Sequence, residues 1–175
     1  MTKKMIKYSI ILTVLICSLA IANESENKND KWLQELNIPI WVQNTFYKRE
    51  ISKEFDYSFD INPMYLRGDF DGDNNPDVAI LVREKSSSKL GMIVIHYASN
   101  EFFVLGAGQK IGNGGDDFKW MSNWSVKRKG KVGQGAGEGT PPELKAEALL
   151  VEKAESASGI IYWDGTKYSW YQQGD

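Results

Sequence analysis

The sequence has very little cysteine and histidine, the two side chains that most often form nucleophilic sites and soft-metal centres. Its 175 residues contain one of each, Cys17 and His96. One cysteine cannot form an intramolecular disulfide, and two such residues are too few for a cysteine- or histidine-rich zinc centre. Because no other cysteine follows Cys17, catalysis by a cysteine–histidine pair is excluded once the N-terminal segment is removed.

Positive charge and phosphate-binding glycine motifs are also scarce. The chain has 21 Lys and Arg residues against 23 Asp and Glu, a formal net charge of −2. A mildly acidic protein is not expected to bind nucleic acid or an anionic membrane surface. The 16 glycines form neither a G-x-x-x-x-G-K-[ST] nor a G-x-G-x-x-G pattern, which excludes both common phosphate-binding loops.

The first 22 residues have the three parts of a secretory signal peptide. A segment with three lysines comes first, an apolar run follows at residues 9–21, and Ala-Ile-Ala at residues 20–22 forms a small-x-small cleavage signal. The apolar run is too short for a membrane span; an uncleaved N-terminal anchor helix is the alternative. We therefore expect residues 1–22 to be removed. The mature chain, residues 23–175, would be one domain without a membrane span, with a net charge of 18 − 23 = −5, and periplasmic or secreted.

Hydrophobic patterns predict a mostly β fold of the α+β type, in which an antiparallel meander follows short N-terminal helices. A helix is expected at residues 31–36, and the next segment, through Tyr47, is compatible with a second helix or a strand. A further helix at residues 118–124 would place Trp120 and Trp124 on one face. Alternation, apolar runs and turn residues predict strands at residues 55–61, 78–82, 91–97, 102–105, 144–151, 159–163 and 167–171.

Three connecting segments carry further expectations. Asp164-Gly165 predicts a hairpin turn between the last two strands. The pair Asp116-Asp117 is expected to supply an N-cap for the helix at residues 118–124. Residues 127–142 have glycine at every second position from Gly133 to Gly139 and are expected to form a long mobile loop. This loop begins with a basic run that is either a solvated face or a docking edge for an acidic partner: Lys127, Arg128, Lys129 and Lys131.

Four aspartates crowd the segment GDFDGDNNPDVAIL at residues 68–81, immediately before an apolar run. With the first aspartate as position 1, carboxylates occupy positions 1, 3, 5 and 9: Asp69, Asp71, Asp73 and Asp77. Two like charges about 4 Å apart repel by about 1 kcal/mol in water and by about 4 kcal/mol at an effective dielectric constant near 20. Oxygen ligands at alternating positions of a tight loop can instead converge on Ca²⁺, with the backbone carbonyl of Asn75 at position 7 as a further ligand. The spacing therefore predicts a calcium site; a solvated acidic turn without metal is the alternative.

The same segment resembles the calcium loops of FG-GAP and VCBS repeats, familiar from the propellers of integrin α-subunits, whose pattern is close to D-x-D-G-D-x-x-x-D followed by a strand. It departs from an EF-hand, which has glycine at position 6 and an acid at position 12, where this chain has Asn74 and Ile80. The resemblance implies carbonyl ligation by Asn75 and side-chain ligation by Asp69, Asp71, Asp73 and Asp77. Only one copy of the motif is present, so a several-bladed propeller is not expected.

These observations predict an exported, non-catalytic binding module that is stabilised by one Ca²⁺ and recognises a protein or glycan partner outside the cytoplasm. A periplasmic inhibitor or immunity-type protein is one alternative, and it would dock through the Gly133–Gly139 loop and the basic run. A metal-assisted hydrolase is the other alternative, and it requires an open coordination position. His96 lies in the apolar strand expected at residues 91–97, and the sequence identifies no catalytic partner for it.

Overall fold

The computed structural model describes residues 35–136 and 139–174. Contacts divide the chain into a first unit of residues 1–39 and a second unit of residues 40–175. The expected signal peptide, residues 1–22, lies outside the described residues. Within the described ranges, no helix is both long and apolar enough to cross a membrane. All elements named below belong to the second unit.

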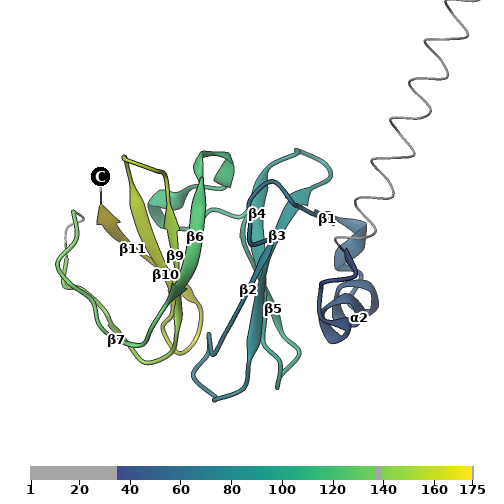
Figure 1. Ribbon diagram of the computed structural model, residues 1–175, viewed down its shortest axis with the longest axis horizontal. Coiled ribbons are helices and arrows are strands. Elements are labelled where there is room, and N and C mark those ends of the chain that lie inside the picture. The colour runs from purple at the N-terminus through teal and green to yellow at the C-terminus, as the bar shows by residue number, and fades with distance from the viewer. Residues whose placement is uncertain (1–34, 137–138, 175) are drawn as a thin grey trace, which may run out of the picture. The chain divides into compact units, whose positions relative to one another are not determined.

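The first sheet is antiparallel and has five strands, with β3 and β4 at its centre (Figure 1). The strands are β1 (Phe55–Tyr57), β2 (Tyr65–Gly68), β3 (Asp77–Glu84), β4 (Leu90–Ile95) and β5 (Phe102–Gly106). β1 and β2 pair with β3 on the same edge, β1 along its C-terminal half and β2 along its N-terminal half. Strands β3, β4 and β5 follow one another as a meander, which confirms the antiparallel prediction.

The second sheet is also antiparallel and has the strand order β11-β10-β9-β6. Its strands are β6 (Asn123–Lys127), β9 (Ala148–Glu152), β10 (Ser158–Trp163) and β11 (Tyr168–Gly174), and a separate ladder joins β7 (Gly130–Lys131) to β8 (Glu143–Leu144). The hairpin between β10 and β11 turns at Asp164-Gly165, as the sequence predicts. Gly165 has a φ of 104°, a conformation that glycine adopts without steric cost.

One α-helix covers the first sheet on the side away from the second sheet (Figure 1). This helix, α2 (Ile40–Lys48), confirms the helical alternative for the segment through Tyr47. Of the helix expected at residues 31–36, residues 31–34 lie outside the described residues. Val42 and Phe46 are four residues apart, so they share one face of α2, and both are buried. Phe46 stacks on Tyr57 of β1 with ring centroids 4.2 Å apart. Three 3₁₀ turns are η1 (Ile51–Lys53), η2 (Gly112–Gly114) and η3 (Phe118–Trp120).

The main core lies between the two sheets. Alternate residues of β3 and β4 face the second sheet and pack with its buried side chains in a cluster that includes Ala79, Leu81, Met92, Val94, Trp124, Leu149, Val151 and Ile161. The intervening residues of β3 and β4 are also buried, on the side that α2 covers: Val78, Ile80, Val82, Ile93 and Ile95. A strand buried on both faces needs no polar alternation, which explains the continuous apolar run at residues 78–82.

The strand expected at residues 55–61 is wrong in its second half. β1 ends at Tyr57, and the chain leaves the sheet before β2 begins. In this interval the carboxylate of Asp60 pairs with the guanidinium of Arg83 at 2.6 Å, and Pro63 has no N–H to donate to a strand ladder. The alternation of apolar and polar residues therefore extends beyond Tyr57, where β1 ends.

Two further expectations from apolar spacing are wrong. The helix expected at residues 118–124 is a single 3₁₀ turn, η3, after which β6 begins at Asn123. Asp117 does cap that turn, because its side chain accepts a hydrogen bond from the backbone N–H of Lys119 at 3.2 Å. The strand expected at residues 144–151 is divided between β8 and β9.

In its described part, the glycine-rich segment expected to be a long mobile loop at residues 127–142 makes backbone contacts with β11. The backbone N–H of Gly135 donates to the hydroxyl of Tyr171 at 2.9 Å. A Cβ atom at Gly135 would lie 2.2 Å from the carbonyl oxygen of Gln172. Glycine therefore permits a close approach of two backbones here.

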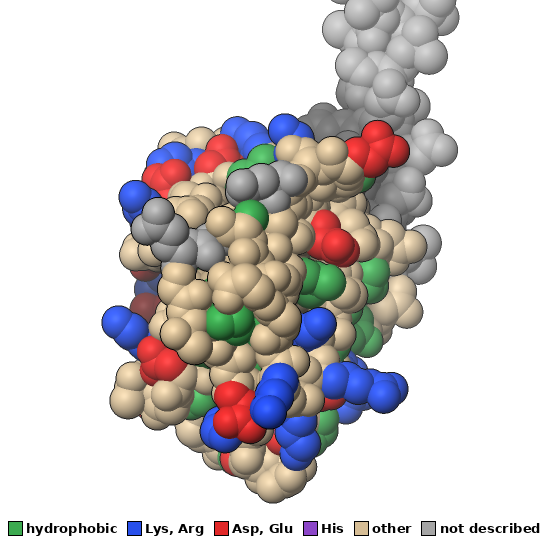
Figure 2. Space-filling view, turned by 90° about the vertical axis from the view of Figure 1, so that its left-hand side faces the viewer, with side chains coloured by type: hydrophobic (Ala, Val, Ile, Leu, Met, Phe, Trp, Pro, Cys, Tyr) green, Lys and Arg blue, Asp and Glu red, His purple; other side chains and the backbone are tan. Residues whose placement is uncertain are grey.

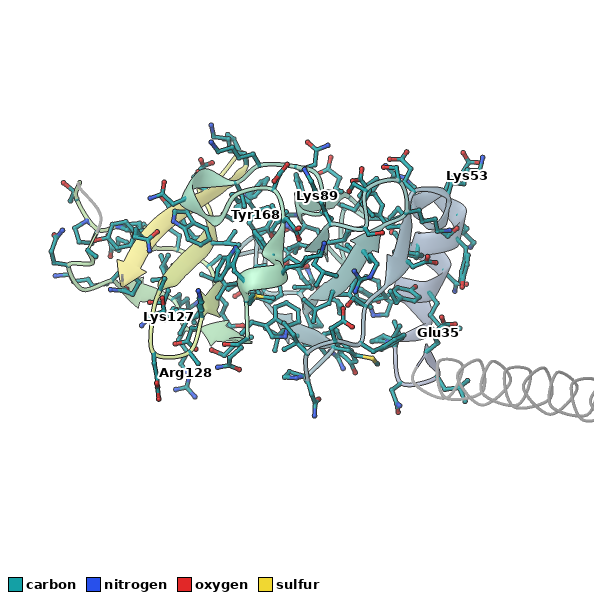
Figure 3. The ribbon with its side chains drawn as sticks, turned by 90° about the horizontal axis from the view of Figure 1, so that it is seen from above. Glu35, Lys53, Lys89, Lys127, Arg128 and Tyr168 are labelled. Atoms are coloured by element: carbon teal, nitrogen blue, oxygen red, sulfur yellow. The ribbon has the colours of Figure 1, made fainter. Side chains whose placement is uncertain are left out.

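The basic run lies at the end of β6 and along β7. Arg128, Lys129 and Lys131 are exposed, and Lys127 is half-buried. Lys127 and Arg128 lie toward the periphery in Figure 3. Figure 2, which faces the side of the second sheet, shows Lys and Arg side chains gathered at the lower end of that surface. This exposure is compatible with both alternatives, a solvated charged face and a docking edge for an acidic partner.

Trp124 is the largest side chain in the core, and its removal is expected to be costly. It is 1% exposed, and its Nε1–H donates to the carbonyl oxygen of Pro63 at 2.7 Å. We expect Trp124→Ala to lower the free energy of unfolding by about 3–5 kcal/mol, measured by urea denaturation. The control is Ile40→Ala, at a side chain that is 69% exposed. A similar loss of unfolding free energy in both variants would contradict the placement of Trp124 in the core.

The β10–β11 turn is expected to weaken in acid. Backbone N–H groups of Lys167 and Thr166, with hydroxyls of Thr166 and Ser169, hold the pKa of Asp164 well below its ordinary value of 3.8. A lowered pKa in the folded chain gives stability that is present above the ordinary pKa and is lost as pH falls through the folded value. Asp164→Asn should therefore be less stable than the wild type at pH 7, and the gap should narrow below about pH 4. Urea unfolding at each pH measures this difference in stability. A difference that does not change with pH would show that the ionised carboxylate of Asp164 does not stabilise the turn.

Candidate metal centre

The predicted side-chain ligands come together at the connection between β2 and β3, at the lower edge of the first sheet in Figure 1. Two overlapping groups of possible ligands result, and within each group the ligand atoms lie within 4.8 Å of one another. The first contains Asp69, Asp71 and Asp73, and the second contains Asp71, Asp77 and, in addition to the predicted ligands, His96. Asp71 belongs to both groups. Asn75, the fifth predicted ligand, lies in the same loop next to Asp73.

Hydrogen bonds from the loop backbone fold the acidic segment around its own carboxylates. The N–H of Gly72 donates to Asp69 Oδ1 at 2.8 Å. The N–H of Asp73 donates to Asp71 Oδ1 at 3.0 Å, and the N–H of Asn75 donates to Asp73 Oδ1 at 2.7 Å. Such bonds, from a backbone N–H to an aspartate two or three residues earlier, are the local turns that short acidic side chains favour. They keep three like charges close together despite their repulsion.

The middle of the loop needs left-handed backbone, and the sequence supplies it. Gly72 has a φ of 87° and Asn74 a φ of 69°, and asparagine is one of the few side chains that tolerate this region. The Asn75 side-chain amide donates to Asp73 Oδ2 at 3.0 Å. Together with the Asn75 backbone N–H, it lowers the pKa of Asp73 below the usual range, so this carboxylate stays ionised at neutral pH.

Asp77 is the most deeply buried member of the cluster. It begins β3 and has no exposed surface. Its Oδ2 accepts a hydrogen bond from the N–H of Phe70 at 2.8 Å, and its Oδ1 accepts one from the N–H of Tyr97 at 2.9 Å. Burial raises the pKa of Asp77, although the two N–H groups act in the opposite direction. This carboxylate ties the acidic loop to the turn between β4 and β5.

His96 joins the cluster from the end of β4, a position that the sequence alone did not predict. It is 2% exposed. Its Nδ1 lies 3.3 Å from Asp71 Oδ2, and its Nε2 lies 2.8 Å from the hydroxyl of Tyr168 on β11. Burial and the nearby charges of Asp77 and Asp71 raise the pKa of Tyr168, so the phenol keeps its proton. Figure 3 shows Tyr168 in the interior of the unit.

A strand pattern could have indicated the position of His96. Met92, Val94 and His96 alternate along one strand, so all three point to the same side. Met92 and Val94 belong to the core between the sheets, and His96 continues their row toward the acidic loop. The identity of its partners depends on β11 and on residues 71–77, which no local pattern connects to β4.

Glu147 links the acidic loop to the second sheet. Its Oε2 accepts a hydrogen bond from the N–H of Asp69 at 3.0 Å, and its own N–H donates to the carbonyl oxygen of Asp69 at 2.8 Å. Glu147 immediately precedes β9. These paired bonds fix the start of the loop against the residue that precedes β9 of the second sheet.

The spacing of Asp69, Asp71 and Asp73 is compatible with a calcium ion, whereas Asp77 is grouped with Asp71 and His96 and not with Asp69 or Asp73. Two oxygens at the usual Ca²⁺ distance of about 2.3–2.6 Å can lie up to about 5.2 Å apart, and the grouped atoms lie within 4.8 Å. Carboxylate oxygens are hard donors that suit Ca²⁺, whereas a histidine nitrogen suits softer ions. His96 already bonds Tyr168 through Nε2. His96 therefore fits better as a neighbour of the Asp71 carboxylate, with its Nδ1 3.3 Å from Oδ2, than as a calcium ligand.

The acidic pair at residues 116–117 lies outside both groups. The carboxylate of Asp116 forms an ion pair with Lys89, which lowers the pKa of Asp116. Asp117 accepts from the backbone N–H of Leu90 at 2.9 Å and caps η3. The pair therefore fastens β4 to η3.

No protein-family model, curated protein or solved structure matches the chain. The assignment of the centre therefore depends on the geometry described above and on the resemblance of the segment at residues 68–81 to FG-GAP and VCBS loops. Neither the geometry nor this resemblance indicates an enzymatic activity.

The bond between Tyr168 and His96 is expected to matter for stability. Tyr168→Phe leaves the buried Nε2 of His96 without its partner, so we expect a loss of about 1–3 kcal/mol in urea unfolding. The control is Tyr97→Phe, because the Tyr97 side chain is 51% exposed and should change the stability by less than about 0.5 kcal/mol. Equal losses in the two variants would refute the role of the Tyr168 hydroxyl.

Proposed function

We propose that the chain is an exported, non-catalytic binding module whose fold is stabilised by one Ca²⁺ in an FG-GAP-like loop. The ion would be held by the backbone carbonyl of Asn75 and by four carboxylates: Asp69, Asp71, Asp73 and Asp77. The observation that carries this proposal is the convergence of Asp69, Asp71 and Asp73 in a loop whose own backbone donates to each of them.

The ion would supply positive charge where the fold concentrates negative charge. Without a cation, each close pair of carboxylates costs between about 1 and 4 kcal/mol, depending on how much water screens it. Asp77 is fully buried and Asp71 is 16% exposed in its side chain, so screening is weakest on the inner side of the loop. Because Glu147 and Tyr168 connect the same region to the second sheet, the ion would stabilise the contact between the sheets as well as the loop.

Burial of the inner side of the centre supports a structural role over a hydrolytic one. A metal-assisted hydrolase needs an open coordination position that substrate can reach. Asp77 and His96 are closed to solvent, and the Nε2 of His96 is engaged by Tyr168.

The inhibitor alternative loses support from the packing of the glycine-rich segment. That alternative needs the segment at residues 133–139 as a free docking edge. Gly135 instead donates to Tyr171, and Ala136 N–H donates to the carbonyl oxygen of Gln173 at 3.3 Å. A general binding module does not require this segment to be free, and we therefore favour it.

Export would control the loading of such a site. Extracellular calcium modules bind with Kd values of about 10⁻⁴–10⁻³ M, so a site of this class would fill after the chain leaves the cytoplasm. The signal-peptide pattern at residues 1–22 supports export.

Calcium is expected to raise the melting temperature. At 10 mM CaCl₂, about 100 times a Kd of about 10⁻⁴ M, linkage gives about 2.7 kcal/mol, or about 5–10 °C for a chain of this length. EGTA should reverse the shift, and Asp71→Ala should abolish it, because Asp71 belongs to both groups. Differential scanning calorimetry measures each shift.

The matched control is Glu143→Ala, which removes an exposed carboxylate paired only with the exposed Lys145. It should retain the full calcium shift. A wild-type calcium response in Asp71→Ala, or a chain that Zn²⁺ stabilises and Ca²⁺ does not, would overturn the proposed calcium site.

A further inference from the structure

A second concave site lies on the second sheet, away from the acidic loop. It is a cavity of about 220 Å³ between η2, η3, the β9–β10 turn and the C-terminal part of β11. His96, beside the acidic loop, bonds Tyr168 at the first residue of β11, whereas the cavity is lined by Trp170 and Gln172 further along the strand. The lining is mixed: two tryptophans, amide and hydroxyl side chains, and Lys153 as its one charged group among the described residues.

Glycines make the space that Trp170 occupies. A Cβ atom at Gly159 would lie 2.0 Å from Trp170 Cζ2, one at Gly114 would lie 2.6 Å from Cζ3, and one at Gly112 would lie 2.4 Å from its Cβ. Any larger residue at these three positions would displace the indole. These three glycines therefore have a packing role, because they leave room for the indole ring of Trp170.

Trp120 and Trp170 form a corner whose polar atoms are already used. Their ring centroids are 6.3 Å apart at an interplanar angle of 81°. Trp120 Nε1–H donates to the carbonyl oxygen of Gly114 at 2.9 Å, and Trp170 Nε1–H donates to Gln172 Oε1 at 3.1 Å. The two indoles therefore contribute carbon surface to the cavity. An approximately perpendicular corner does not form the parallel slot in which a flat aromatic ring would be stacked on both faces.

The rim of the cavity carries polar groups that remain available. In the described part of the chain, the side chains of Asn113, Lys153, Ser156 and Ser158 have no hydrogen bond to another protein group. Asn113, Lys153 and Ser156 are also exposed. Hydrogen-bonding side chains around an aromatic floor discriminate ligands that carry hydroxyl groups from those that do not.

We propose that this cavity binds one unit of a neutral or acidic saccharide. A pyranose ring has an apolar C–H face, which suits the electron-rich face of an indole, and a periphery of hydroxyls, which suits Asn113, Ser156 and Ser158. The volume is below the range of about 300–1,000 Å³ typical of drug-sized ligands, so a single sugar unit fits better than a longer segment. Lys153, without a carboxylate among the described lining residues, disfavours a cationic ligand.

This site gives a ligand class to the binding function proposed above, and the assignment rests on that function. The cavity does not require calcium as a ligand, so the two ideas fail separately. If saccharide binds while calcium leaves the melting temperature unchanged, the calcium site is wrong and the cavity assignment stands. If calcium stabilises the chain and saccharides do not bind, the cavity assignment is wrong.

The test is binding of the labelled full chain to an array of neutral, N-acetylated and acidic glycans. Isothermal titration calorimetry then measures affinity for the best free trisaccharide, in CaCl₂ and in EGTA. We expect Trp120→Ala and Trp170→Ala to weaken binding about tenfold or more. Asn113→Ala and Lys153→Ala should each weaken it by about two- to tenfold through a lost hydrogen bond.

Controls keep the result interpretable if an indole variant is unstable. Asn113 and Lys153 are exposed, so their variants should keep the wild-type melting temperature and report on binding alone. Lys167→Ala removes an exposed lysine just before β11, outside the cavity, and should bind like the wild type. Retention of no glycan, equal affinity in the Asn113, Lys153 and Lys167 variants, or binding of tryptamine, an indole with an alkylamine, in place of sugars would overturn the proposal.

Discussion

The structure depends on the close packing of carboxylates where the two sheets meet. Asp71 is the pivot, because it is grouped with Asp69 and Asp73 on one side and with Asp77 and His96 on the other. Like charges at this spacing repel, and the fold opposes that repulsion with backbone N–H groups directed at each carboxylate. A cation would remove the repulsion, and the sheets that enclose the cluster would then be stabilised together.

The second sheet contributes residues both to the surroundings of the acidic loop and to the glycine-lined cavity. β11 places Tyr168 against His96 and, further along the same strand, Trp170 in the glycine-lined cavity. The cavity is formed by turns that come from η2, η3 and the β9–β10 connection. A rigid strand pairing between β10 and β11 thus gives both sites a common support, while their side chains remain separate.

Much of the fold could be predicted because, in some segments, the conformation that the local sequence favours is also the one that core packing and sheet pairing require. β3 is apolar along its length since both of its faces are buried, and Asp164-Gly165 turns because its residues favour that turn. The prediction was wrong at residues 118–124. There Phe118, Met121 and Trp124 are spaced as on a helix, but all three reach the core from a 3₁₀ turn and a strand. Core packing decided that conformation against the local pattern.

The sequence by itself determined that four aspartates crowd one short loop, because their spacing within nine residues is a local property of the chain. It also determined the central strands and the last hairpin. Only the tertiary structure decided that His96 and Glu147 contact that loop, that Tyr168 bonds His96, and that Gly112, Gly114 and Gly159 surround Trp170. Such contacts join residues that are distant in the chain, and their positions follow from sheet pairing and core packing, which no short stretch of sequence encodes.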